Sequence, residues 1–199
     1  MDRTQDCGSC DAGSIPAEGT IFKMISIPNP QKKKALIVVD MQSGFLPEQT
    51  RWIIPNVKEV IENGKYDLYI EAIFHAEPGS LWDKQTDWTF DLEPTIPEIK
   101  EYLKGKELIT LTKTTKSAFQ ADKDLTTILK KKDIEEVHIV GVDANDCILA
   151  TAFDSFDAGF FTYVIEECIE SSNGNGLREA ALTILRNVDL TNHSSKITL

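Results

Sequence analysis

The sequence predicts an α/β domain in which a doubly wound parallel sheet carries helices on both faces. Continuous apolar runs rich in β-branched residues recur along the chain, and segments with one apolar helical face lie between them. Strands buried on both faces of a parallel sheet have this uninterrupted apolar character. Their alternation with helices is typical of βαβ units. The 199 residues, of which 41% are hydrophobic, suffice for one such domain.

The first expected strand, residues 35–39 (ALIVV), ends directly before Asp40. The other expected strands are residues 67–74, 107–112, 136–141 and 160–165, with residues 188–191 as a candidate sixth strand. Apolar residues at helical spacing predict helices over residues 56–62, 122–132, 146–158 and 176–186. Residues 75–106 are expected to form a long loop with one short helix at 96–104. Loops of this length inside compact domains usually have a functional role.

Residues 1–30 are expected to be an extended leader, which could include a short edge strand at 20–27, and residues 31–199 form the domain. The leader contains a Cys-x-x-Cys pair, Cys7 and Cys10. It lacks the strand-to-helix context of a redox pair and the second ligand pair of a zinc site. We therefore interpret this pair as incidental.

The charge balance excludes several classes of partner. The chain has 32 acidic and 21 basic residues, for a net charge of −11. A nucleic-acid-binding protein needs a basic face to neutralise phosphates, and an anionic membrane attracts basic segments. No run approaches the roughly 18 apolar residues of a membrane span, and the first residues lack a signal-peptide pattern. We expect a cytoplasmic protein with a small-molecule substrate.

Three strand ends carry residues whose side chains could take part in catalysis. Asp40 follows the first strand, Lys113 follows the third, and Cys147 begins the helix after the fourth. The carboxyl ends of parallel strands meet at one edge of the sheet, where ligands of such folds bind. A helix N-terminus, which Asn145 or Asp146 could cap, and a nearby cation both favour the thiolate form of a cysteine. Singly, however, residues in such positions are more often a turn aspartate, a surface lysine and a packed thiol, and it is their combination at three strand ends that indicates chemistry.

Three segments resemble the isochorismatase-like cysteine hydrolases, which include nicotinamidases and N-carbamoylsarcosine amidohydrolase. Residues 35–45 (ALIVVDMQSGF) are similar to that family's opening strand, which ends in Asp-x-Gln-x-x-Phe. Residues 113–119 (KTTKSAF) look like its lysine segment, and residues 141–152 (GVDANDCILATA) like its nucleophile segment. The resemblance runs in order over residues 33–190.

The resemblance implies a triad of Asp40, Lys113 and Cys147. It also implies a cis peptide bond between Val142 and Asp143, which aims the backbone N–H groups of Asp143 and Cys147 into the site as an oxyanion hole. The fold implied is a six-stranded parallel sheet in the order 3-2-1-4-5-6. Members of the family are often dimers or tetramers, so we expect a homo-oligomer.

The sequence departs from the family pattern before the nucleophile, at Asp143 and at Ala144-Asn145 where many members have a Thr-Asp pair, and in the second-strand loop. Asp143 stands where many members have a small residue, and a carboxylate beside the oxyanion hole disfavours anionic substrates. Nicotinamidases of the family build a metal site from an aspartate and two or more histidines in the second-strand loop, whereas this loop has only His75. We therefore predict no metal. The sequence also lacks a dinucleotide fingerprint and a phosphate loop, so no cofactor is expected.

The function predicted is cysteine-dependent hydrolysis of a small amide or related C–N bond through a thioester. Candidate residues of the substrate pocket are Gln42, Phe45, His75, Trp82 and Trp88. One alternative is an isochorismatase-type vinyl ether hydrolase that does not use the cysteine. Others are a non-enzymatic binding or assembly module and, from the strand-end Asp and Lys alone, a phospho-acceptor switch domain.

Overall fold

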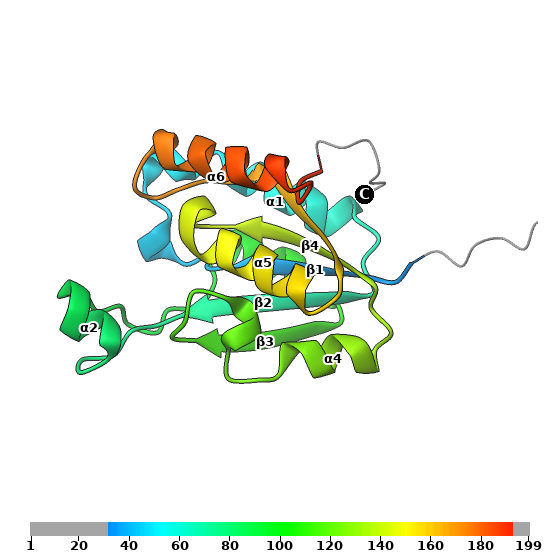
Figure 1. Ribbon diagram of the computed structural model, residues 1–199, viewed down its shortest axis with the longest axis horizontal. Helices are drawn as coiled ribbons and strands as arrows, with labels where there is room; N and C mark the ends of the chain where they lie inside the picture. The colour runs from blue at the N-terminus through cyan, green and yellow to red at the C-terminus, as the bar shows by residue number, and fades with distance from the viewer. Residues whose placement is uncertain (1–31, 193–199) are drawn as a thin grey trace, which may run out of the picture. The chain divides into compact units, whose positions relative to one another are not determined.

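Residues 32–192 are described in the computed structural model of the chain, and they form an α/β unit on one parallel sheet (Figure 1). The sheet has five strands in the order β3-β2-β1-β4-β5. The strands are β1 (Lys34–Val39), β2 (Leu68–Phe74), β3 (Leu108–Lys113), β4 (Glu136–Gly141) and β5 (Phe161–Ile169). The expected leader, its candidate edge strand, and Cys7 and Cys10 lie outside the described residues.

Six α-helices lie between and after these strands. They are α1 (Ile53–Asn63), α2 (Leu81–Thr86), α3 (Pro97–Leu103), α4 (Leu125–Lys131), α5 (Leu149–Asp157) and α6 (Asn175–Asn187). Helix α1 starts earlier than the expected residue 56 because Pro55 fits in its first turn, where a backbone N–H has no partner within the helix. None of the helices within residues 32–192 has the length and hydrophobicity needed to cross a bilayer.

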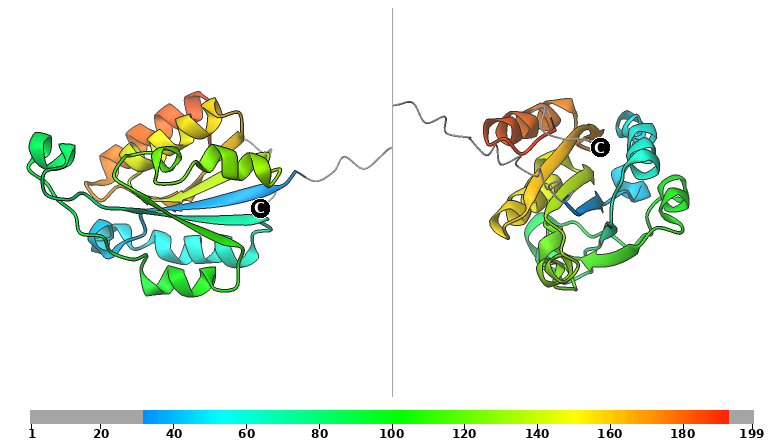
Figure 2. Two further views of the ribbon diagram at one scale, coloured as in Figure 1. Left: turned by 90° about the horizontal axis from the view of Figure 1, so that it is seen from below. Right: turned by 90° about the vertical axis from the view of Figure 1, so that its right-hand side faces the viewer.

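The apolar strands are buried because helices cover both faces of the sheet. All six residues of β1 are buried. Ala35, Ile37 and Val39 pack on one face with residues of α4, α5 and α6, whereas Leu36 and Val38 pack on the other with residues of α1 and α3. Figure 2 shows the two helical layers on opposite sides of the sheet. This arrangement confirms the doubly covered parallel sheet expected from the uninterrupted apolar runs.

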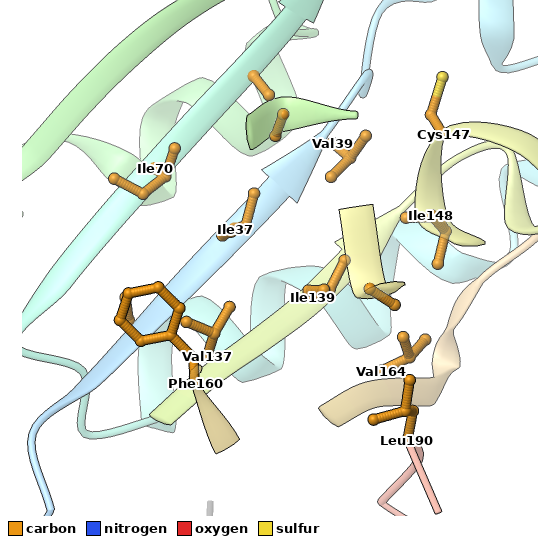
Figure 3. Packing of buried hydrophobic residues seen from close by; sticks show 14 of the residues in the cluster. Ile37, Val39, Ile70, Val137, Ile139, Cys147, Ile148, Phe160, Val164 and Leu190 are labelled. Carbon is orange, nitrogen blue, oxygen red and sulfur yellow. The ribbon is translucent and has the colours of Figure 1, made fainter. Parts of the chain in front are cut away.

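The first of these two cores extends up to the beginning of the segment that carries Cys147. Figure 3 shows Ile148 beside Ile139 and Val164, while Cys147 lies at the margin of the cluster, near Val39. Ile148 is fully buried, and burial of such a side chain contributes about 1.5–3 kcal/mol. The packing of Ile148 thus fixes the backbone from which Cys147 projects.

The expected sixth strand at residues 188–191 is wrong for the described part of the chain. Only one parallel bridge forms there, between Val164 and Thr191. Helix α6 continues to Asn187, and Asp189 then takes a left-handed backbone with φ of 56°. Because this turn occupies residues of the expected strand, they cannot extend along β5, and the described sheet has five strands.

The long loop between β2 and β3 holds two helices. Helix α3 confirms the short helix expected at 96–104, whereas α2 was not expected. Ser80 caps α2 by accepting a hydrogen bond from the Asp83 N–H at 3.3 Å. The helix buries none of its residues, so it lacks the apolar periodicity by which helices are detected.

Two residues with reactive side chains serve the packing of the sheet. His138 is fully buried in β4, with Nδ1 2.8 Å from the Tyr66 hydroxyl and Nε2 2.9 Å from Glu136. Cys168 in β5 is buried as well, and burial raises the pKa of its thiol to about 12. Both environments indicate structural roles for these two residues.

Candidate active site

The pairing register of the sheet brings the ends of β1 and β4 together. Val39, the last residue of β1, pairs with Gly141, the last residue of β4. The N–H of Val142 then donates to the Val39 carbonyl at 3.1 Å. Gly141 has φ of 120°, and a Cβ at this position would lie 2.1 Å from the Val39 carbonyl oxygen. Only glycine lets the chain turn here from β4 toward Cys147.

Asp40 occupies an unusual backbone conformation directly after β1. Its φ is 51°, in the left-handed region that Asp tolerates better than most residues, and its side chain is 1% exposed. Oδ2 accepts a hydrogen bond from Lys113, whereas Oδ1 is buried without a hydrogen-bond partner among the described residues. A buried carboxylate oxygen without a donor is costly, and such exceptions concentrate at functional sites.

Lys113 reaches Asp40 from two strands away. It ends β3, pairs with Phe74 across β2, and is 1% exposed. Its Nζ lies 2.8 Å from Asp40 Oδ2, 3.4 Å from Cys147 Sγ and 3.2 Å from the Thr115 carbonyl. These three partners match the three protons of an ammonium group. The structure therefore brings Asp40, Lys113 and Cys147 together, as the strand ends predicted.

Cys147 lies in a π-helical segment, Ala144–Ile148, that leads into α5. The expected single helix over residues 146–158 is thus divided into this segment and α5. Neither Asn145 nor Asp146 caps it, since Asp143 is the capping residue and its carbonyl accepts the N–H groups of Asp146 and Ile148. Single π-helical turns are rare and occur frequently at functional sites.

The peptide bond between Val142 and Asp143 is cis, as the resemblance implied. The N–H of Asp143 donates to no atom of residues 32–192, so it is available to a ligand. The carboxylate of Asp143 accepts two hydrogen bonds from Ser172, one from the backbone N–H at 2.6 Å and one from the hydroxyl at 2.8 Å. The loop after β5 therefore buttresses the turn that precedes Cys147.

Burial dominates the protonation of this cluster. It raises the pKa of the Cys147 thiol well above its usual value; Asp40 raises it further, and Lys113 lowers it. Burial also raises the pKa of Asp40 against the lowering effect of Lys113. Burial disfavours the charge on Lys113, but the neighbouring anions outweigh it and raise its pKa. The cluster therefore holds a charged lysine and one negative charge, with a proton shared between carboxylate and thiol.

We predict that Lys113→Met slows alkylation of Cys147 by iodoacetamide near neutral pH. Because Lys113 lowers the pKa of the thiol, its removal raises that pKa further and reduces the thiolate fraction. The rate is measured between about pH 5 and 9 in the parent and the variant. Lys130→Met, which removes an exposed lysine of α4, is the control for net charge. Equal alkylation of parent and Lys113→Met across this range would exclude Lys113 from the cluster.

A cavity of about 520 Å³ opens onto the thiol. Asp40, Asp143 and Cys147 line it on the side of the sheet. Five aromatic rings line it as well, with neighbouring ring centroids 4.4 to 6.3 Å apart. These rings, called the aromatic wall below, belong to Phe45, Phe74, Trp82, Trp88 and Phe90.

The aromatic wall contains three of the five residues proposed for the substrate pocket, namely Phe45, Trp82 and Trp88. Gln42 and His75 do not line the cavity. Gln42 is fully buried and exchanges two hydrogen bonds with the backbone of Phe74, so its amide joins the loop after β1 to β2. The nearest charged partner of His75 is the exposed Glu77, 3.9 Å away.

Comparison with known proteins identifies the family of this chain. The isochorismatase domain matches residues 34–195. The chain belongs to the isochorismatase domain family. It is 26% identical over 167 residues to the isochorismatase family protein PncA of Bacillus subtilis, covering 72% of this chain and 90% of that protein.

Two further matches, one to a curated protein and one to a solved structure, carry a named activity. Maleamate amidohydrolase of Pseudomonas putida is 22% identical over 165 residues, which cover 69% of this chain and 72% of that enzyme. The crystal structure of the nicotinamidase/pyrazinamidase PncA from Bacillus subtilis has a TM-score of 0.60 and 25% identity, covering 78% of this chain and 95% of that one.

The metal site that the resemblance implies for nicotinamidases does not fit this member of the isochorismatase family. His75 and Glu77 are the metal-binding residue types at the end of β2, and Glu77 points to solvent with 79% of its side chain exposed. No three His, Cys, Asp or Glu side chains within residues 32–192 are grouped as metal ligands. The residues present at the end of β2 therefore do not form a metal site of that kind.

Sequence reasoning missed part of this isochorismatase-family cavity. Phe74 and Phe90 belong to the aromatic wall, and Asp146, Ser172 and Asn173 also line the cavity. Phe74 ends β2, so the rule that located Asp40 and Lys113 at strand ends applies to it equally. Phe90 and Ser172 lie in loops, where the sequence carries no comparable signal.

Proposed function

We propose that this chain hydrolyses a small amide, or a related C–N bond, with Cys147 as the nucleophile. The observation that carries the proposal is the contact of Lys113 Nζ with both Asp40 and the Cys147 sulfur at the bottom of the cavity. An ammonium group shared by a carboxylate and a thiol lets negative charge move between them without changing the charge of the cluster. The activities named for the two relatives, a nicotinamidase and an amidohydrolase, support an amide substrate.

In the first half of the reaction, the thiol proton moves to Asp40 and the Cys147 sulfur attacks the carbonyl carbon. The free Oδ1 of Asp40 is the acceptor, because Oδ2 is engaged by Lys113. The backbone N–H groups of Asp143 and Cys147 hold the oxyanion. Asp40 then returns the proton to the leaving nitrogen as the C–N bond breaks, which leaves a thioester on Cys147 and releases ammonia or an amine.

In the second half, a water molecule attacks the thioester carbonyl and Asp40 takes its proton. The C–S bond breaks and that proton returns to the thiolate, so the cluster regains its starting state. The products are a carboxylic acid and the free enzyme. Lys113 stays charged throughout and stabilises whichever of Asp40 and Cys147 is the anion.

The aromatic wall favours a catalytic role over a binding module in which the triad is inert. A cavity of about 520 Å³ that ends at a nucleophile is of the size that holds a small organic substrate. In a vinyl ether hydrolase that does not use the thiol, the contact between Lys113 and Cys147 would have no role in the reaction. A phospho-acceptor domain likewise has no role for Cys147.

The proposal is tested by incubating the full chain with a panel of small primary amides and measuring released ammonia. Reactions are quenched in acid, and the intact protein is weighed by mass spectrometry. A substrate should add the mass of its acyl group to the protein, located by peptide mapping on Cys147. Turnover without any adduct, or an adduct on another residue, would contradict the thioester mechanism.

A further inference from the structure

The charges that line the cavity are all negative. Three carboxylates, those of Asp40, Asp143 and Asp146, line it, and no lysine, arginine or histidine of residues 32–192 is among its lining residues. Two of these carboxylates have a cation behind them. Lys113 pairs with Asp40, and Lys116 pairs with Asp146. Their charges are therefore largely compensated before a substrate enters.

Asp143 is different, because its carboxylate is bound only by neutral donors. Both of its oxygens accept hydrogen bonds from Ser172, at 2.6 Å and 2.8 Å. Burial raises the pKa of Asp143 against the lowering effect of the Ser172 hydrogen bonds, and the negative charges of Asp146 and Glu170 raise it further. Asp143 is thus a half-buried carboxylate on the cavity wall without a counter-ion among residues 32–192. A cationic ligand would supply the missing charge.

The aromatic wall offers a second feature that a cation prefers. Aromatic ring faces attract ammonium groups within about 6 Å of the ring centroid. Two lysine ammonium groups of the chain already contact rings of the aromatic wall. Lys113 Nζ lies 4.9 Å from the Phe74 centroid, and Lys116 Nζ lies 4.7 Å from the Trp82 centroid. Trp88, 36% exposed, contacts Phe45 and Phe90 and has no such partner among the described residues.

We propose that the preferred ligands of the cavity are small amides that carry an alkylammonium or other cationic group, held by the aromatic wall and the Asp143 carboxylate. This inference rests on the proposed function, because it names the class of amide that Cys147 would meet. A carboxylate-bearing amide is disfavoured, since it would add a fourth negative charge to the same cavity. The specificity comes from repulsion of anions as much as from attraction of cations.

The test uses three amides that differ chiefly in charge. Betaine amide carries a trimethylammonium group, 3,3-dimethylbutanamide replaces that group by a neutral tert-butyl group, and malonamate carries a carboxylate. Binding is measured by calorimetry on the full chain with Cys147→Ala, so that no turnover occurs. Betaine amide should bind at least about tenfold more tightly than the neutral amide, and malonamate should bind most weakly.

Two variants in the Cys147→Ala background identify the source of the preference. Asp143→Asn retains an acceptor for the Ser172 N–H, and it should bring the cationic and neutral amides within about threefold of each other. Trp88→Leu should weaken the binding of the cationic amide more than the binding of the neutral amide. Asp157→Asn, which changes the same charge at an exposed end of α5, should leave the preference intact.

Equal binding of the cationic and neutral amides would overturn the inference, as would a preference for malonamate or no binding of betaine amide in the millimolar range. A preference that persists in both Asp143→Asn and Trp88→Leu would overturn it too. These outcomes are separate from failure of the proposed function. If the parent releases no ammonia from any amide while the charge preference holds, the mechanism fails and the ligand class stands.

Discussion

Replacing Cys147 by alanine is expected to abolish amide hydrolysis and to leave the fold intact. The covalent route has no substitute in the cavity, since Asp40 is paired with Lys113 and the Ser172 hydroxyl donates a hydrogen bond to Asp143. Loss of the nucleophile should reduce kcat by about 10³-fold or more, which corresponds to roughly 4 kcal/mol of barrier. The side chain retains 9% exposure at the margin of the core, so its truncation leaves little void.

Ammonia release and thermal unfolding are measured together on Cys147→Ala. Cys168→Ala is the matched control, because Cys168 is the other cysteine within residues 32–192 and lies in β5, outside the lining of the cavity. It should keep parental turnover even if it unfolds at a lower temperature. Activity of Cys147→Ala within tenfold of the parent would refute the nucleophile assignment.

The location of this cluster could be predicted because a parallel sheet places every strand's carboxyl end on one edge. Asp40 and Lys113 each stand at the end of an apolar run, and that pattern sufficed to place them together. The residue pattern by itself could not show that Lys113 reaches Asp40 across β2, and the strand order came from the family resemblance. This contact depends on the strand order, which follows from packing between elements distant in the sequence.

The aromatic wall was predicted only in part, and the reason is physical. Trp82 and Trp88 attract notice in a long loop because exposed tryptophans are uncommon, so Trp residues there suggest a binding surface. Phe74 has the apolar side chain of an ordinary β2 residue, and its position at the end of the strand is the one sequence feature that separates its ring from the core. Gln42 was assigned to the pocket from its position in a motif, but its amide satisfies buried backbone groups instead.

The candidate sixth strand shows the opposite limitation. Residues 188–191 are apolar enough for a strand, but strand formation also requires that the preceding helix end early enough. Helix boundaries are set by capping and tertiary packing, and they are the least certain part of a prediction from sequence. Here the N–H groups of residues 188–190 still donate to carbonyls of the last turn of α6, and a single bridge to β5 forms at Thr191.

Asp40→Asn should separate two properties of Cys147 that usually change together. Asparagine cannot accept the thiol proton, so acylation should slow by about 10²–10⁴-fold. Yet the negative charge of Asp40 raises the pKa of the thiol, in addition to the larger effect of burial. With that carboxylate neutralised and Lys113 still present, the pKa of Cys147 should fall and the thiolate fraction near neutral pH should increase.

The variant is therefore expected to be alkylated by iodoacetamide faster than the parent near pH 7, while releasing ammonia far more slowly. This is the reverse of Lys113→Met, for which both alkylation and turnover should decline. A simple structural disturbance of the site would not produce this divergence, because it would change both variants in the same direction. Turnover within tenfold of the parent would show that Asp40 is not the proton acceptor. Slower alkylation of Asp40→Asn would show that the carboxylate does not oppose the thiolate, since removing an anion that faces Cys147 can only favour the negative sulfur.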